Sequence, residues 1–83
     1  MQDKSAIYLL HDFIFDTFER GREAKLAYDQ AKSNAPDDME TIFQSGVTMT
    51  YYTILDSLFN RIKQFELEEQ LPIIQELNVE DLL

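Results

Sequence analysis

The feature that most constrains the fold of this 83-residue chain is the spacing of its apolar residues, which recur every three or four positions along two long stretches. In the first stretch, from about residue 3 to 32, the repeat is carried by Ile7, Leu10, Ile14 and Phe18. In the second, from about 36 to 66, it is carried by Phe43, Val47, Tyr51, Ile54, Leu58, Ile62 and Phe65. This period places side chains on one face of an α-helix. The sequence therefore predicts two long helices.

One break, residues 33–38, separates the two stretches. Pro36 suits the first position of a helix, where a missing N–H costs nothing. The carboxylates of Asp37, Asp38 and Glu40 complement the positive N-terminal end of the helix that follows. Because the break is short, we expect the two helices to form a long antiparallel hairpin.

The regular apolar spacing ends after Phe65. An acidic run, Glu66, Glu68 and Glu69, leads to Pro72, which is expected to open a short third helix over 72–77. Asn78 resembles a helix cap and either ends that helix or starts a final turn over 79–83. The predicted fold class is therefore all-α, with residues 1–83 forming a single helical domain.

The two glycines bear on how the helices pair. Gly21 and Gly46 stand at similar distances from Asn34 and would lie opposite each other in a hairpin. They either allow a close approach of the two helices or break one of them, since glycine costs about 1 kcal/mol inside a helix. Both alternatives stay open at this point.

The predicted hairpin has more apolar surface than two helices can cover. Helix 2 carries a second row beside its main one, the helix-2 seam, formed by Thr48, Tyr52, Leu55 and Phe59. This seam is covered by the C-terminal residues, by a second copy of the chain or by another protein. About 12 C-terminal residues in a helix would reach only about 18 Å along a hairpin of about 45 Å. The mismatch favours self-association into a helical bundle.

We therefore expect a set of apolar residues to meet a partner or a second copy. On helix 2 these are Tyr52, Leu55 and Phe59, and on helix 1 they are Tyr8 and Phe15. Beside them on helix 1, the acidic rim is formed by Asp12, Asp16, Glu19 and Glu23.

The charge of the chain points to the kind of partner. A formal net charge of -9 repels nucleic-acid phosphates and anionic lipid, and favours basic or mixed protein surfaces. A protein partner is thus expected, without direct binding to nucleic acid or membrane. The sequence shows neither a signal peptide nor a membrane span, and it contains no cysteine, so we expect a cytoplasmic protein.

Residues suited to catalysis or ligand binding are few. The one histidine, His11, has no carboxylate or second ligand on its helical face, and no catalytic or phosphate-binding motif is present, so neither enzyme activity nor a metal or cofactor is expected. A weaker alternative is a small anionic ligand, such as a nucleotide, held between subunits by Arg20, Arg22, Lys25 and Tyr28. Helix-surface ion pairs with neighbouring acids account for most of that basic group.

These observations predict a small acidic regulator or inhibitor that recognises a protein partner through a helix face. In size, acidity and helical content it resembles small bacterial immunity proteins and phage-encoded inhibitors, a likeness of class that assigns no residue. The alternatives are an oligomeric bundle that binds a small anion, a purely structural oligomerisation module, and a nucleic-acid mimic.

Overall fold

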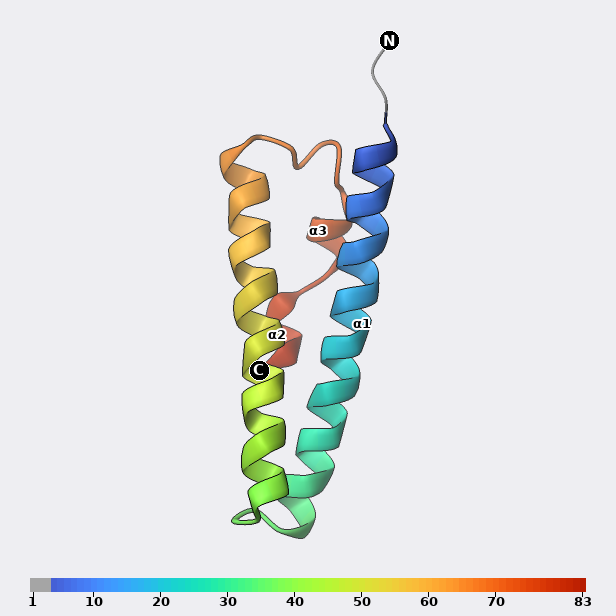
Figure 1. Ribbon diagram of the computed structural model, residues 1–83. Coiled ribbons are helices and arrows are strands. Elements are labelled where there is room, and N and C mark those ends of the chain that lie inside the picture. The colour runs from blue at the N-terminus through green and yellow to red at the C-terminus, as the bar shows by residue number, and fades with distance from the viewer. Residues whose placement is uncertain (1–3) are drawn as a thin grey trace.

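The computed structural model describes residues 4–83, and it is an all-α hairpin (Figure 1). Helix α1 (Ser5–Asn34) and helix α2 (Met39–Gln64) run antiparallel, followed by α3 (Ile73–Glu76) and the 3-10 helix η1 (Val79–Leu82). The predicted fold class is confirmed, and no strand occurs within residues 4–83. The predicted start of the first helix at Asp3 lies outside the described residues.

The turn between the long helices is built around one carbonyl group. The Ala35 oxygen accepts hydrogen bonds from the Asp38 N–H, at 3.1 Å, and from the Thr41 hydroxyl, at 2.7 Å. Residues 36–38 belong to this turn, so α2 begins at Met39 and the expected start at Pro36 is wrong. Asp38, with extended backbone, is the residue that precedes the helix.

The end of α2 is fixed by the backbone. Glu66 has a φ of 58°, in the left-handed region, and the Leu67 N–H donates to the Ile62 carbonyl at 3.0 Å. A left-handed residue with this return bond is a common helix stop. Further on, the Asn78 side chain accepts from the Glu80 N–H at 3.1 Å, so Asn78 starts the final turn, η1.

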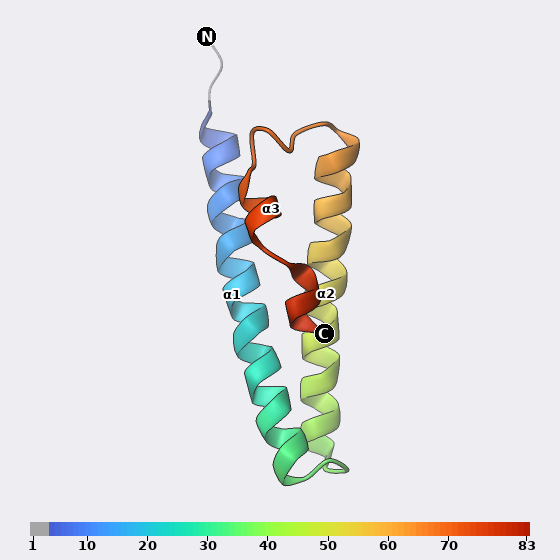
Figure 2. The ribbon, with the colours of Figure 1, turned by 180° about the vertical axis from the view of Figure 1, so that it is seen from behind.

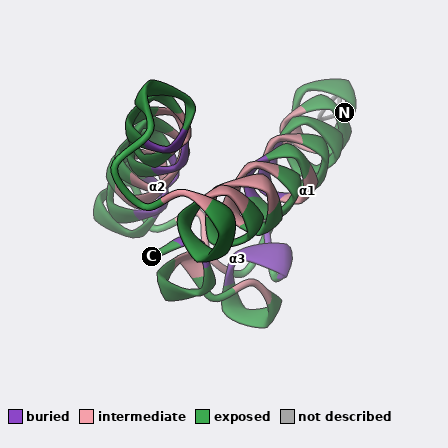
Figure 3. Cartoon of the chain, turned by 90° about the horizontal axis from the view of Figure 1, so that it is seen from below, coloured by how far each residue is buried: buried purple, intermediate pink, exposed green. Residues whose placement is uncertain are grey.

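The C-terminal segment, residues 67–83, folds back along one face of the hairpin. Seen from behind, the red part of the chain lies in front of both long helices (Figure 2), and the end view places it on one side of the pair (Figure 3). The opposite face of the hairpin has no element of the described chain across it. The two long helices make the molecule elongated, with principal extents of 55 × 20 × 17 Å.

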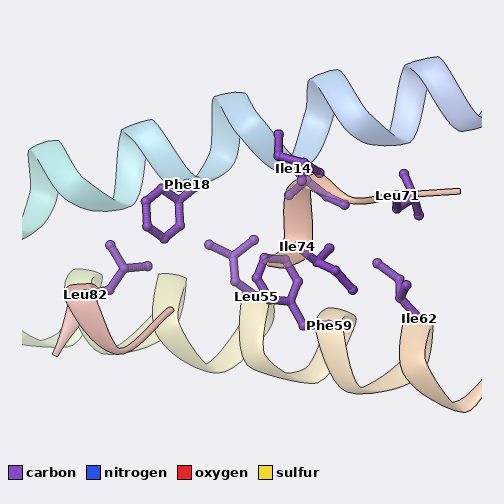
Figure 4. Packing of buried hydrophobic residues seen from close by; sticks show 9 residues of the cluster. Ile14, Phe18, Leu55, Phe59, Ile62, Leu71, Ile74 and Leu82 are labelled. Atoms are coloured by element: carbon purple, nitrogen blue, oxygen red, sulfur yellow. The ribbon is translucent and has the colours of Figure 1, made fainter. Parts of the chain in front are cut away.

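The core lies where the C-terminal segment meets the two helices (Figure 4). It is one cluster of buried residues from all three parts of the fold: Ile14, Phe18, Leu55, Phe59, Ile62, Leu71, Ile73, Ile74 and Leu82. Four of these come from the C-terminal segment, so this segment is an integral part of the core.

Both helices run unbroken through their glycines. A Cβ at Gly21 would lie 3.0 and 3.1 Å from the two methyl carbons of Leu82 and 3.3 Å from the Cβ of Tyr51. A Cβ at Gly46 would meet nothing within 4 Å. The expected pairing of the two glycines is therefore wrong. Gly21 admits Leu82 and Tyr51 to the α1 backbone, whereas Gly46 lies on an exposed part of α2.

Candidate interaction surfaces

The helix-2 seam is covered from within the chain. Leu55 is completely buried and Phe59 nearly so, Thr48 is buried, and Tyr52 is half-buried. The expectation that Leu55 and Phe59 form a free surface for a partner or a second copy is corrected, because the C-terminal segment packs on them.

The segment reaches farther than a single helix of the same length would. Leu77 and Asn78 adopt extended backbone between α3 and η1. An extended residue advances about 3.3 Å along the chain, against about 1.5 Å in a helix. This connector carries Leu82 down to Gly21, so the length estimate that favoured an uncovered seam does not apply.

The main apolar row of α2 is divided between two sides of the helix: Ile62 is buried in the core and Tyr51 packs against it, but the other members are more exposed. Phe43, Ile54 and Phe65 are largely exposed, while Val47 and Leu58 are half-buried. The helix is rotated so that the helix-2 seam points inward, and Phe43, Ile54 and Phe65 lie on the side away from the C-terminal segment.

Helix α1 continues this exposed side. At about 100° per residue, Leu9 and Phe13 lie on the side of α1 that points away from the C-terminal segment, and both are exposed. Three alanines follow on the same side. We call the combined surface the open face, formed by Leu9, Phe13, Ala24, Ala27 and Ala31 of α1 and Phe43, Val47, Ile54, Leu58 and Phe65 of α2. Leu58 lies at the edge of this face and also packs against the core.

A second exposed row lies on the outer side of α1. Tyr8, Phe15 and Leu26 fall within about 20° of one another on the helical wheel, and each exposes half or more of its surface. We call these three residues the outer strip. Tyr8 and Phe15 were expected to meet a partner, and the structure leaves both of them accessible.

The acidic rim lies between the outer strip and the open face on the helical wheel. Its charge is partly compensated within the helix. The Arg20 Nε donates to Asp16 Oδ2 at 3.0 Å, the Arg22 Nη1 donates to Glu19 Oε1 at 3.4 Å, and the rim carboxylate of Asp12 lies 3.3 Å from the His11 ring. Exposed pairs of this kind contribute about 0–1 kcal/mol to stability.

The basic residues considered for an anion site do not converge within one chain. Lys25 donates to Asp29 at 3.0 Å, and its Nζ lies 5.5 Å from the centre of the Tyr28 ring. Arg20 and Arg22 bond to their own helical neighbours on other sides of α1. The geometry therefore gathers Lys25 with Tyr28 but leaves the two arginines apart.

A small hollow of about 140 Å³ adjoins Tyr28, between the long helices and the chain end. It is lined by Tyr28, Ser45, Thr48, Met49, Leu82 and Leu83. Pockets for drug-sized ligands measure about 300–1,000 Å³, so a nucleotide does not fit within it. The buried Thr48 hydroxyl has no hydrogen-bond partner within residues 4–83.

Within residues 4–83, no three His, Cys, Asp or Glu side chains come together as a metal site, and no helix combines the length and hydrophobicity needed to cross a bilayer. Comparisons of the chain with protein families, with curated proteins and with solved structures find no match.

Proposed function

We propose that this protein is a small acidic regulator that binds another protein through the outer surface of α1. The observation that carries the proposal is the outer strip, in which Tyr8, Phe15 and Leu26 are exposed side by side along one helix with the acidic rim beside them. Large apolar side chains next to charged ones are typical of a binding surface, in which a few aromatic residues supply most of the energy.

The charge of the chain supports a basic partner. The net charge of -9 gives a long-range attraction to positive surfaces, which accelerates encounter more than it tightens the final complex. Tyr8 and Phe15 would then provide the buried contact area. The acidic rim would border that contact and disfavour partners with acidic surfaces.

The test is site-specific photo-cross-linking in extract of the cells that make the protein. A photoreactive phenylalanine analogue at Phe15 should capture one predominant protein, and the same analogue at Met39, an exposed residue at the start of α2, should not. Adding Tyr8→Ala to the bait should reduce capture about tenfold or more, as loss of an aromatic anchor does.

Salt provides a second readout on the captured protein. Its association rate should fall as ionic strength rises from about 50 to about 300 mM, because exposed charges become screened over this range. Equal capture from both positions, or capture unaffected by Tyr8→Ala, would reject the outer strip as the binding surface.

A further inference from the structure

We propose that the open face binds a second copy of this chain, packed antiparallel so that α1 lies on its own symmetry mate and α2 on its own. This dimer is independent of the partner surface proposed above, because the outer strip lies on a different side of α1.

The open face has enough apolar surface for such a contact. Phe13, Phe43 and Phe65 expose 58, 63 and 72% of their surface. With about 200 Å² for a phenylalanine side chain, these three alone expose on the order of 400 Å². Leu9, Ile54 and the smaller members bring the face toward the roughly 800 Å² per subunit that a stable interface buries.

The spacing of the face positions indicates what covers them. The open-face residues lie at 9, 13, 24, 27 and 31 on α1 and at 43, 47, 54, 58 and 65 on α2, and four polar residues fill the remaining positions of the same helical stripes: Asp16, Arg20, Thr50 and Arg61. With these polar positions included, both stripes follow the same order of intervals, four, three, four, four, three and four, which reads identically in either direction. A spacing of this kind matches an antiparallel copy of the same helix, as an interface between identical subunits requires.

The two helices share one centre for this symmetry. The middle positions are Arg20 on α1 and Ile54 on α2. Gly21 contacts Tyr51, so the two middle positions lie within about one helical turn of each other along the hairpin. A single two-fold axis across the open face can therefore relate both helices to their mates.

Side-chain size is complementary on α1 in this register. Antiparallel pairing about Arg20 sets Leu9 against Ala31 and Phe13 against Ala27, so the large residues of one half of α1 meet the alanines of the other. On α2, Ile54 meets its own mate, Phe43 meets Phe65 and Val47 meets Arg61, so the alternation of large and small residues is confined to α1. Alternation of large and small residues across a contact gives close packing without overfilling.

The charges near the axis are already balanced. Each Arg20 bonds to Asp16 of its own chain at 3.0 Å, and Asp16 is set against Ala24 of the second copy. The two Arg20 side chains that meet at the axis are therefore each paired with an Asp16 carboxylate. The other residues of the acidic rim stay outside the contact. A polar pair at the centre of an apolar interface fixes the register at some cost in stability.

The register can be tested directly because the chain has no cysteine. Single-cysteine variants A31C and L9C, which keep the Asp16–Arg20 pair, should yield a mixed disulfide dimer when mixed and oxidised, since Cα atoms must come within about 7 Å for a disulfide. A mixture of A24C with V47C tests the rival arrangement, in which α1 lies on α2 of the second copy. Predominant cross-linking of A24C to V47C, or no cross-linking in either mixture, would overturn the proposal.

Molar mass supplies the second readout. The 9.8 kDa chain should scatter light as a species of about twice that mass, about 20 kDa. Ile54→Glu should reduce it to the monomer, whereas Ile42→Glu should not. The two isoleucines lie on the same helix and expose 55 and 64% of their surface, but only Ile54 belongs to the open face. A monomeric wild-type protein, or equal effects of the two substitutions, would refute the dimer.

Discussion

Two adjacent leucines at the end of the chain provide a controlled test of how the C-terminal segment packs. Leu82 is fully buried, with its methyl groups against Gly21, whereas Leu83 exposes 53% of its surface. Leu82→Ala removes buried carbons and leaves a cavity, which costs about 2–5 kcal/mol in protein cores. Leu83→Ala removes the same atoms from a half-solvated position and should stay within about 0.5 kcal/mol.

The expected cost is large for a chain of this size. Domain stabilities of about 0.05–0.15 kcal/mol per residue correspond to about 4–12 kcal/mol here, so Leu82→Ala removes a substantial fraction. At about 4–8 °C per kcal/mol, its melting temperature should fall by roughly 8–40 °C.

The assay is urea denaturation followed by circular dichroism, with both variants at one protein concentration because self-association adds to apparent stability. If Leu82→Ala and Leu83→Ala were equally stable, the C-terminal segment would not pack as described. The covered and open faces of the hairpin would then have to be reassigned.

Two further matched pairs test local features by the same denaturation assay. Gly46→Ala should stabilise by about 0.5–1 kcal/mol because the site is open, whereas Gly21→Ala should be at least 1 kcal/mol less stable than Gly46→Ala, since its Cβ crowds a packed contact; equal effects would refute that contact. Thr41→Val should cost about 1–2 kcal/mol by removing the 2.7 Å bond to the Ala35 carbonyl, but Thr48→Val should be neutral or stabilising because the Thr48 hydroxyl has no partner within residues 4–83; a loss at Thr48 as large as at Thr41 would contradict this.

The hairpin could be predicted from the sequence because its signals are local. The three- and four-residue spacing around Ile14 and Phe18 and the break at 33–38 each depend on residues close together in the chain. The rotation of α2 could not be predicted in the same way. Ile54 and Leu55 are neighbours in the chain, and each belongs to an apolar row with helical spacing, so periodicity alone does not decide which row is buried.

Contacts with the C-terminal segment, which is distant in sequence, determine which apolar row of α2 is buried. Leu82 packs beside Gly21, sixty-one positions earlier in the chain, and draws the Leu55 side of α2 inward. The residues around Gly21 do not indicate that Leu82 packs against it. Leu77 and Asn78 are extended, so no helical periodicity predicts the connector that they form.

Of the two candidate surfaces, one could be predicted from the sequence and the other could not. The accessibility of Tyr8 and Phe15 followed from the wide apolar arc of helix 1, which one neighbouring helix cannot cover. The open face was missed because Phe43, Ile54 and Phe65 fit a hairpin seam equally well by spacing. The open face can be distinguished from the hairpin contact only because the structure shows that the helix-2 seam is the buried row.

The central claim is that the C-terminal segment covers the Leu55 side of the hairpin and leaves the Ile54 side free for a second copy. Methyl NOE spectroscopy on a mixture of labelled and unlabelled chains tests it most directly. The account predicts intrachain NOEs from the Leu82 methyls to the Gly21 Hα, and interchain NOEs between Ile54 methyls. Leu82 methyls without long-range NOEs, or interchain NOEs from Leu55 in place of Ile54, would contradict it.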